Sequence, residues 1–177
     1  MAMTIILWRF ITGLFSLFLL SMAYLTVPIV TALKSTGSFE TVMMFFYILF
    51  IYMALHFIVR AAVQQLTIYQ WIVVTMIFMA YLVLILTTPY AVERIHVLFY
   101  SIHGVLYLKT LPEKLRGIKR YLAAGIITAA IGAADELLQI YVPGRFPAVS
   151  DVMLNTVSGM LGLVFASKVQ SWKLKLP

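Results

Sequence analysis

The chain has 177 residues, of which 63% are hydrophobic and only 11% are charged, with a formal net charge of +7. Soluble domains are about 45–50% apolar and about 25% charged, so this composition predicts one integral membrane domain. Cysteine is absent, which excludes disulfides, thiolate metal sites and cysteine nucleophiles.

Six apolar segments follow one another along the chain, and a helix needs about 20 mostly apolar residues to cross a bilayer. They cover residues 5–30, 41–59, 68–88, 95–110, 120–141 and 151–169. The first exceeds the apolar region of a signal peptide and is interpreted as an uncleaved helix that ends near Pro28. The fourth is short, so we expect an all-α bundle of about six membrane-spanning helices, with five as the alternative.

The basic residues predict how these helices are oriented. If the amino terminus is cytoplasmic, only Lys34, Arg94 and Arg145 fall on the outer side. The other ten of the thirteen are then cytoplasmic: Arg9, Arg60, Lys109, Lys114, Arg116, Lys119, Arg120, Lys168, Lys173 and Lys175. An excess of Lys and Arg marks cytoplasmic loops, so both termini are expected in the cytoplasm and the protein in the plasma membrane. The positive charge is thus a topology signal, and no basic face or motif points to nucleic acid.

We expect three parts along the chain. Residues 1–88 hold the first three helices, and residues 89–169 form a core of the last three with an outer loop at 142–150. Residues 170–177 form a basic cytoplasmic tail.

Polar side chains gather at the outer ends of the last three spans. Ionisable groups inside a membrane are rare and usually functional, so we expect them to form one outward-facing pocket. The candidate binding residues are Glu93, Arg94, His96, Gln139, Arg145, Asp151 and Asn155, and the candidate catalytic residues are His96, Asp135 and Glu136.

Several of these residues have structural alternatives. Asp151 follows Ser150, a good N-cap, and an acid in the first turn suits the helix dipole. Arg145 alternatively pairs with a carboxylate of the fifth span, and Gln139 and Asn155 alternatively join helices by hydrogen bonds.

The two carboxylates of the fifth span are expected to have different roles. Glu136 is rotated by about 100° from Asp135, whereas Gln139 shares a helix face with Asp135.

A polar stripe runs along the fourth span. His96, Tyr100, His103 and Tyr107 lie on one helix face, which should point into the bundle because lipid would not satisfy it. His96 is a candidate proton carrier, whereas His103 and His56 are interpreted as packing residues. His96 and His103 are about 10.5 Å apart along the axis, too far to share a metal ion, and no metal or cofactor is expected.

Small residues predict which helices pack closely. Gly125, Ala129 and Gly132 share one face of the fifth span, and Ser158 and Gly162 continue the Asn155 face of the sixth. Small residues four apart let backbones approach, so these two spans should form a hairpin.

The stretch at residues 135–162, DELLQIYVPGRFPAVSDVMLNTVSGMLG, resembles the signature of the VanZ-like membrane proteins. Its Asp-Glu pair, the later Gln, Pro-Gly-Arg and the Asp and Asn four apart match that signature, and His96, Tyr100 and Gly104 match the family's upstream motif. Ser158 stands where glycine is usual and keeps the position small. His103 stands where an apolar residue is usual, so analogy assigns it no role. The resemblance covers residues 89–165 and implies a bacterial cell-envelope protein linked to low-level teicoplanin resistance, without implying a reaction.

Four functions remain open at this stage. The first is binding or handling of an anionic amphiphile, a lipid or a lipid-linked envelope precursor, at helix N-termini beside Arg94 and Arg145. The second is an enzyme in which Asp135 or Glu136 acts as base with His96 as partner, although no nucleophile motif is present. Proton-coupled transport is weakened by polar groups that lie near one surface only, and the fourth is a structural scaffold.

Overall fold

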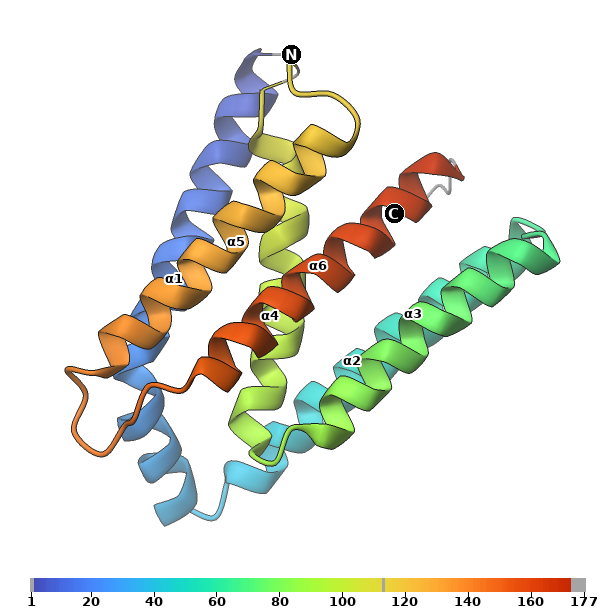
Figure 1. Ribbon diagram of the computed structural model, residues 1–177. Coiled ribbons are helices and arrows are strands. Elements are labelled where there is room, and N and C mark those ends of the chain that lie inside the picture. The colour runs from blue at the N-terminus through green and yellow to red at the C-terminus, as the bar shows by residue number, and fades with distance from the viewer. Residues whose placement is uncertain (1, 113, 173–177) are drawn as a thin grey trace.

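The computed structural model describes residues 2–112 and 114–172, which form six α-helices and, within these ranges, no strand (Figure 1). The helices are α1 (Ala2–Ser35), α2 (Phe39–Val63), α3 (Ile68–Thr87), α4 (Ala91–Thr110), α5 (Ile118–Gln139) and α6 (Val149–Ser171). All of them except α4 are long and apolar enough to cross a membrane. The predicted all-α class with six helices is confirmed.

Successive helices run in opposite directions. Figure 1 shows the beginning of α1, the α2–α3 loop, the α4–α5 connection and the end of α6 toward one end of the molecule. The loops that follow α1, α3 and α5 lie at the opposite end. Lys34, Arg94 and Arg145 belong to this second end, which we call the outer end. Residues 170 and 171 of the predicted tail at 170–177 belong to α6, and Lys173 and Lys175 lie outside the described residues.

The first helix is longer than its sequence suggests. α1 continues through Pro28 to Ser35, so the end predicted near Pro28 is wrong. Proline has no N–H, and the carbonyl of Tyr24 therefore loses its helical partner. The helix ends instead at Ser35, two residues before Gly37, whose φ of 68° is a left-handed conformation that glycine adopts without strain.

α4 occupies the middle of the bundle. It packs most extensively against α6 and also against α1 and α5. Its side chains Val97, Tyr100 and His103 are almost completely buried. The surrounding helices shield this polar face from lipid, which explains how a helix with a weak apolar signal is accommodated.

Glycines set the distance between α6 and its neighbours. A Cβ on Gly132 of α5 would lie 3.0 Å from the Asn155 Cβ, so the predicted α5–α6 hairpin is confirmed. Gly162 faces α4 instead, where an added Cβ would collide with the backbone of Ser101. Close packing therefore joins α6 to both helices.

The α2–α3 hairpin packs at the side of this bundle. A capping box between Thr67 and Gln70 starts α3. The Phe57 ring of α2 lies 4.8 Å from the Phe165 ring of α6, and Trp172 packs against the same aromatic cluster. Much of the remaining hairpin surface is exposed and apolar, as lipid contact requires.

Candidate functional site

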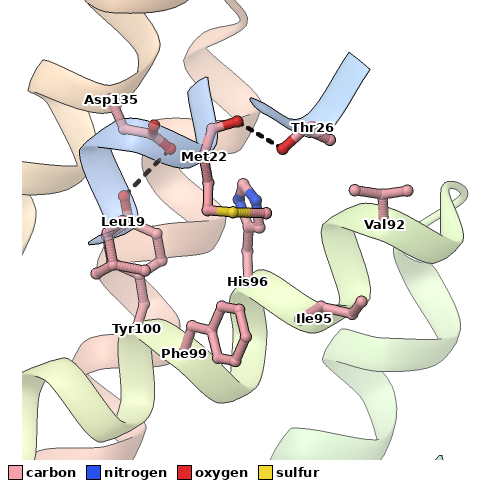
Figure 2. Close-up of a pocket in the computed structure, with 9 residues that line it drawn as sticks. All are labelled: Leu19, Met22, Thr26, Val92, Ile95, His96, Phe99, Tyr100 and Asp135. Carbon is pink, nitrogen blue, oxygen red and sulfur yellow. Dashed lines mark hydrogen bonds between the residues drawn. The ribbon is translucent and has the colours of Figure 1, made fainter. Parts of the chain in front are cut away.

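Asp135 of α5 points toward α4 and is almost completely buried. The Tyr100 hydroxyl donates a hydrogen bond of 3.2 Å to its Oδ2 atom (Figure 2). The second oxygen, Oδ1, is buried without a hydrogen-bond partner. Asp135 therefore has an unused acceptor in the protein interior, which is costly unless water or a ligand occupies it.

Glu136 has different partners and holds the outer loop. Its Oε1 accepts a hydrogen bond from Gln139 Nε2 at 3.1 Å, and its Oε2 accepts one from the backbone N–H of Ala148 at 3.3 Å. Ala148 directly precedes α6, so Glu136 caps the start of that helix from α5. The predicted division of roles is therefore seen in the geometry, whereas Gln139 bonds Glu136 and not Asp135.

A small cavity adjoins Asp135. Figure 2 shows its lining, with His96 projecting from α4 toward α1. Its volume is about 30 Å³, which suits water molecules and excludes a lipid headgroup. The lining residues are Leu19, Met22, Thr26, Val92, Ile95, His96, Phe99, Tyr100 and Asp135. α1 thus supplies one wall of the site, which was not predicted from the sequence.

Arg145 lies in the loop between α5 and α6, near these carboxylates. It interacts electrostatically with Glu93, Asp135 and Glu136, yet within residues 2–112 and 114–172 it forms no direct ion pair with them. Its Nε atom is buried without a hydrogen-bond partner. The alternative that Arg145 latches the loop through a salt bridge is therefore not seen in the geometry.

Arg94 points away from this cluster. Its Nε donates to the Thr88 carbonyl at 2.9 Å, and its Nη1 donates to the Tyr47 hydroxyl of α2 at 3.3 Å. The guanidinium therefore ties α2 to the start of α4. Of the two outer arginines of the last three spans, only Arg145 faces the carboxylates.

The start of α6 differs from the prediction. The helix begins at Val149, one residue before Ser150, so the predicted Ser150 N-cap is wrong. The Ser150 hydroxyl instead donates to Asp151 Oδ1 at 3.1 Å. Asp151 interacts electrostatically with Glu93 across the outer end.

Asn155 is completely buried between α4 and α5. Its amide faces the His96 ring but makes no hydrogen bond of normal geometry. Gly132 leaves the space that Asn155 occupies. A further buried amide therefore adjoins the cavity residues with its hydrogen-bonding capacity unused.

A second polar group lies deeper in the bundle. The Ser16 hydroxyl of α1 is 2.9 Å from His103 Nε2 and 3.3 Å from the Tyr107 hydroxyl. The apolar run of α1 predicted only a membrane span, although Thr12, Ser16 and Thr26 share one helix face and all prove to be buried. The spacing of these three residues was the signal in the sequence that could have indicated a polar face of α1. The predicted inward orientation of the α4 stripe is confirmed by Tyr100 and His103.

His56 stays apart from both polar groups. Its ring stacks on Tyr52 at 6.0 Å within α2, and its Nε2 atom is buried without a partner. Over the described residues, no three His, Asp or Glu side chains lie close enough together to hold a metal ion.

The VanZ/LLP1 family model matches residues 3–170. The match therefore runs from α1 to α6 and extends well beyond the motifs at residues 89–165. No curated protein and no solved structure matches the chain. Together with five apolar spans and the VanZ-like motifs around Tyr100 and Asp135, this match shows that the chain is a multi-pass membrane protein that belongs to the VanZ/LLP1 family.

Proposed function

We propose that the outer end of the bundle binds the headgroup of an amphiphile, either a membrane lipid or a lipid-linked envelope precursor. The observation that carries this proposal is the Arg145 guanidinium, which has no ion-pair partner within residues 2–112 and 114–172. A phosphate or carboxylate on the headgroup would accept charge-assisted hydrogen bonds from this guanidinium.

The remaining charges restrict the headgroup further. Arg145 interacts electrostatically with Glu93 and Glu136, which in turn interact with Asp151, so a purely anionic ligand would be repelled by the acids. A headgroup that carries hydroxyl or ammonium groups beside its anionic group satisfies both kinds of residue. In the first turn of α6 the N–H groups of Asp151 and Val152 bond the Ala148 carbonyl, so those of Val149 and Ser150 are the ones that would supply further donors to the anion.

Apolar side chains beside Arg145 support an amphiphile over a water-soluble anion. Tyr141, Phe146 and Val149 flank Arg145 in sequence and are all strongly exposed. Such residues at the outer end can contact an acyl or polyprenyl chain while Arg145 holds the headgroup. The proposal therefore assigns the two parts of an amphiphile to adjacent residues of one loop.

The cellular part of the proposal follows from this ligand class. An envelope precursor is available at the outer face of a bacterial plasma membrane, which is the orientation that the basic residues predict. On this view, binding of a precursor alters the sensitivity of the cell to teicoplanin. Growth of an expressing strain at graded teicoplanin concentrations tests this part separately from lipid binding.

The binding test replaces Arg145. Purified protein in phosphatidylcholine nanodiscs is titrated with phosphatidylglycerol and with extracted envelope lipids, and bound lipid is measured by native mass spectrometry. Arg145→Ala should weaken binding at least about tenfold, since a hydrogen bond to a charged group is worth about 1.5–3 kcal/mol. Arg145→Lys should retain part of the lipid binding.

Lys34→Ala provides the matched control, because Lys34 is an exposed base at the same end but far from the carboxylates in sequence. It should bind as the unmodified protein does. Equal lipid binding by folded Arg145→Ala and Lys34→Ala would refute the proposal.

An enzymatic reaction at the same end is the alternative, and one observation favours it. The cavity between Asp135 and His96 admits water, and Asp135 Oδ1 is free to accept a proton from it. Glu136 is less suited, because both of its oxygens hold the loop. Release of a labelled headgroup from envelope lipids, lost in Asp135→Asn, would support hydrolysis, and no release across envelope lipids would exclude it.

A further inference from the structure

A row of polar side chains continues from the cavity toward the other end of α4. The rings of His96, Tyr100, His103 and Tyr107 follow one another, with successive centroid distances of 6.0, 6.1 and 4.9 Å. Tyr100 and His103 are completely buried. The polar residues are therefore not confined to the outer end, contrary to the expectation from sequence.

Ser16 links the deeper members of this row. Its hydroxyl lies 2.8 Å from the Thr12 carbonyl, 2.9 Å from His103 Nε2 and 3.3 Å from the Tyr107 hydroxyl. A hydroxyl has one proton and can rotate between these partners. Ser16 can therefore donate to one neighbour while it accepts from another, which is what transfer of a proton along a hydrogen-bonded chain requires.

Unused polar atoms lie along the same row. His103 Nδ1, Thr128 Oγ1 and Asp135 Oδ1 are each buried without a hydrogen-bond partner. Buried polar atoms of this kind usually bind ordered water, and the cavity beside Asp135 has room for it. The cavity is lined by Tyr100 and Asp135 but not by His103, so a connection to the His103–Ser16 pair requires water to reach His103 Nδ1.

We propose that this row, from His96 and Asp135 to Tyr107, conducts protons between the outer polar cluster and the opposite end of α4. His103 takes a proton on Nδ1 from a protonated water molecule, which is left as neutral water, and releases its Nε2 proton to the Ser16 oxygen. Ser16 passes its own proton to the Tyr107 oxygen, and Tyr107 releases its original proton to water. Each step breaks one N–H or O–H bond and forms another, so no charge accumulates in the row.

The surroundings of the row suit this role. His103 has Ser16 and Phe15 of α1 beside it and Tyr100 and Tyr107 on its own helix, with no charged partner among the described residues. At the outer end of the row, Asp135 faces Tyr100 and interacts with Arg145 and Asp151. His96 interacts with Arg145, Asp151 and Asn155. Near the opposite end of α4, Arg9 donates a hydrogen bond to the Thr110 carbonyl, and Lys109 is exposed.

The experiment measures proton flux through the purified full chain in liposomes of phosphatidylcholine and phosphatidylglycerol. Pyranine inside reports pH, and valinomycin with potassium balances charge. The unmodified protein should dissipate a pH gradient faster than protein-free liposomes. Ser16→Ala should reduce the flux to the protein-free rate, because the hydroxyl is the link between His103 and Tyr107.

Two further variants keep the result decisive. Ser21→Ala is the matched control, since Ser21 lies on α1 with an exposed hydroxyl that bonds only the Phe18 carbonyl, and its flux should be unchanged. Ser16→Thr keeps a hydroxyl and should restore flux. Flux equal to that of protein-free liposomes, or full flux in folded Ser16→Ala, would overturn the proposal.

Discussion

Asp135 and Glu136 are adjacent in sequence but belong to different hydrogen-bond networks. One rotation of about 100° along α5 turns Asp135 toward Tyr100 and Glu136 toward the loop before α6. At the scale of single residues, the helical period was therefore enough to predict separate roles. It was not enough to predict their partners, because Tyr100 and Ala148 lie on other elements.

The Tyr100–Asp135 pair leads to a stability prediction. Tyr100→Phe leaves both oxygens of a buried carboxylate without the hydroxyl donor, and this should lower the free energy of unfolding by about 1–3 kcal/mol. SDS-induced unfolding in mixed micelles measures it. Tyr141→Phe, which changes an exposed tyrosine, should have no effect. In an Asp135→Asn background the cost of Tyr100→Phe should shrink, and an unchanged cost would show that the pair is not coupled.

At the scale of elements, α4 and α6 are the closest pair in the bundle. Gly162 places the α6 backbone directly against Ser101, and Gly104 lies against the Gly159 carbonyl, which would be 2.8 Å from an added Cβ. This closeness brings Asn155 beside His96 and so assembles the candidate site. Small-residue spacing predicted that α6 packs closely, but spacing alone could not indicate that Gly162 faces α4 instead of α5.

Gly162→Ala tests this packing. The added methyl group must push α4 and α6 apart, so we expect a loss of about 1–3 kcal/mol in the free energy of unfolding. Gly13→Ala is the matched control, because no atom lies within 4 Å of its added Cβ, and it should change stability by less than about 1 kcal/mol. Unfolding curves of the two variants should therefore separate clearly. Coincident curves would mean that the α4–α6 contact is looser than described.

At the scale of the whole molecule, the orientation predicted from basic residues agrees with the alternating helices but has its own test. The chain has no cysteine, so single cysteines report cleanly. Lys34→Cys should react with a membrane-impermeant maleimide in intact cells, whereas Lys114→Cys should react only after permeabilisation. Labelling of Lys114→Cys in intact cells would reverse the proposed orientation and place the Arg145 site on the cytoplasmic face.

Much of the architecture was predictable because membrane helices are encoded by long apolar runs and their breaks. The deeper polar group was not, because Ser16 and Thr12 lie within such a run and gain significance only when α1 packs against His103. The contacts of Arg94 were not predictable for a similar reason. Its partner Tyr47 belongs to α2, and nothing in the local sequence indicates that neighbour.

Pro28 has a consequence for access to the small cavity beside Asp135. The missing N–H leaves the turn after Tyr24 without one of its bonds, so α1 bends there at less cost than elsewhere. Thr26, which lines the cavity, lies within this turn. Thr26 is therefore the residue of the wall that a small bend of α1 would displace at least cost, while the deeper contacts of Ser16 stayed in place.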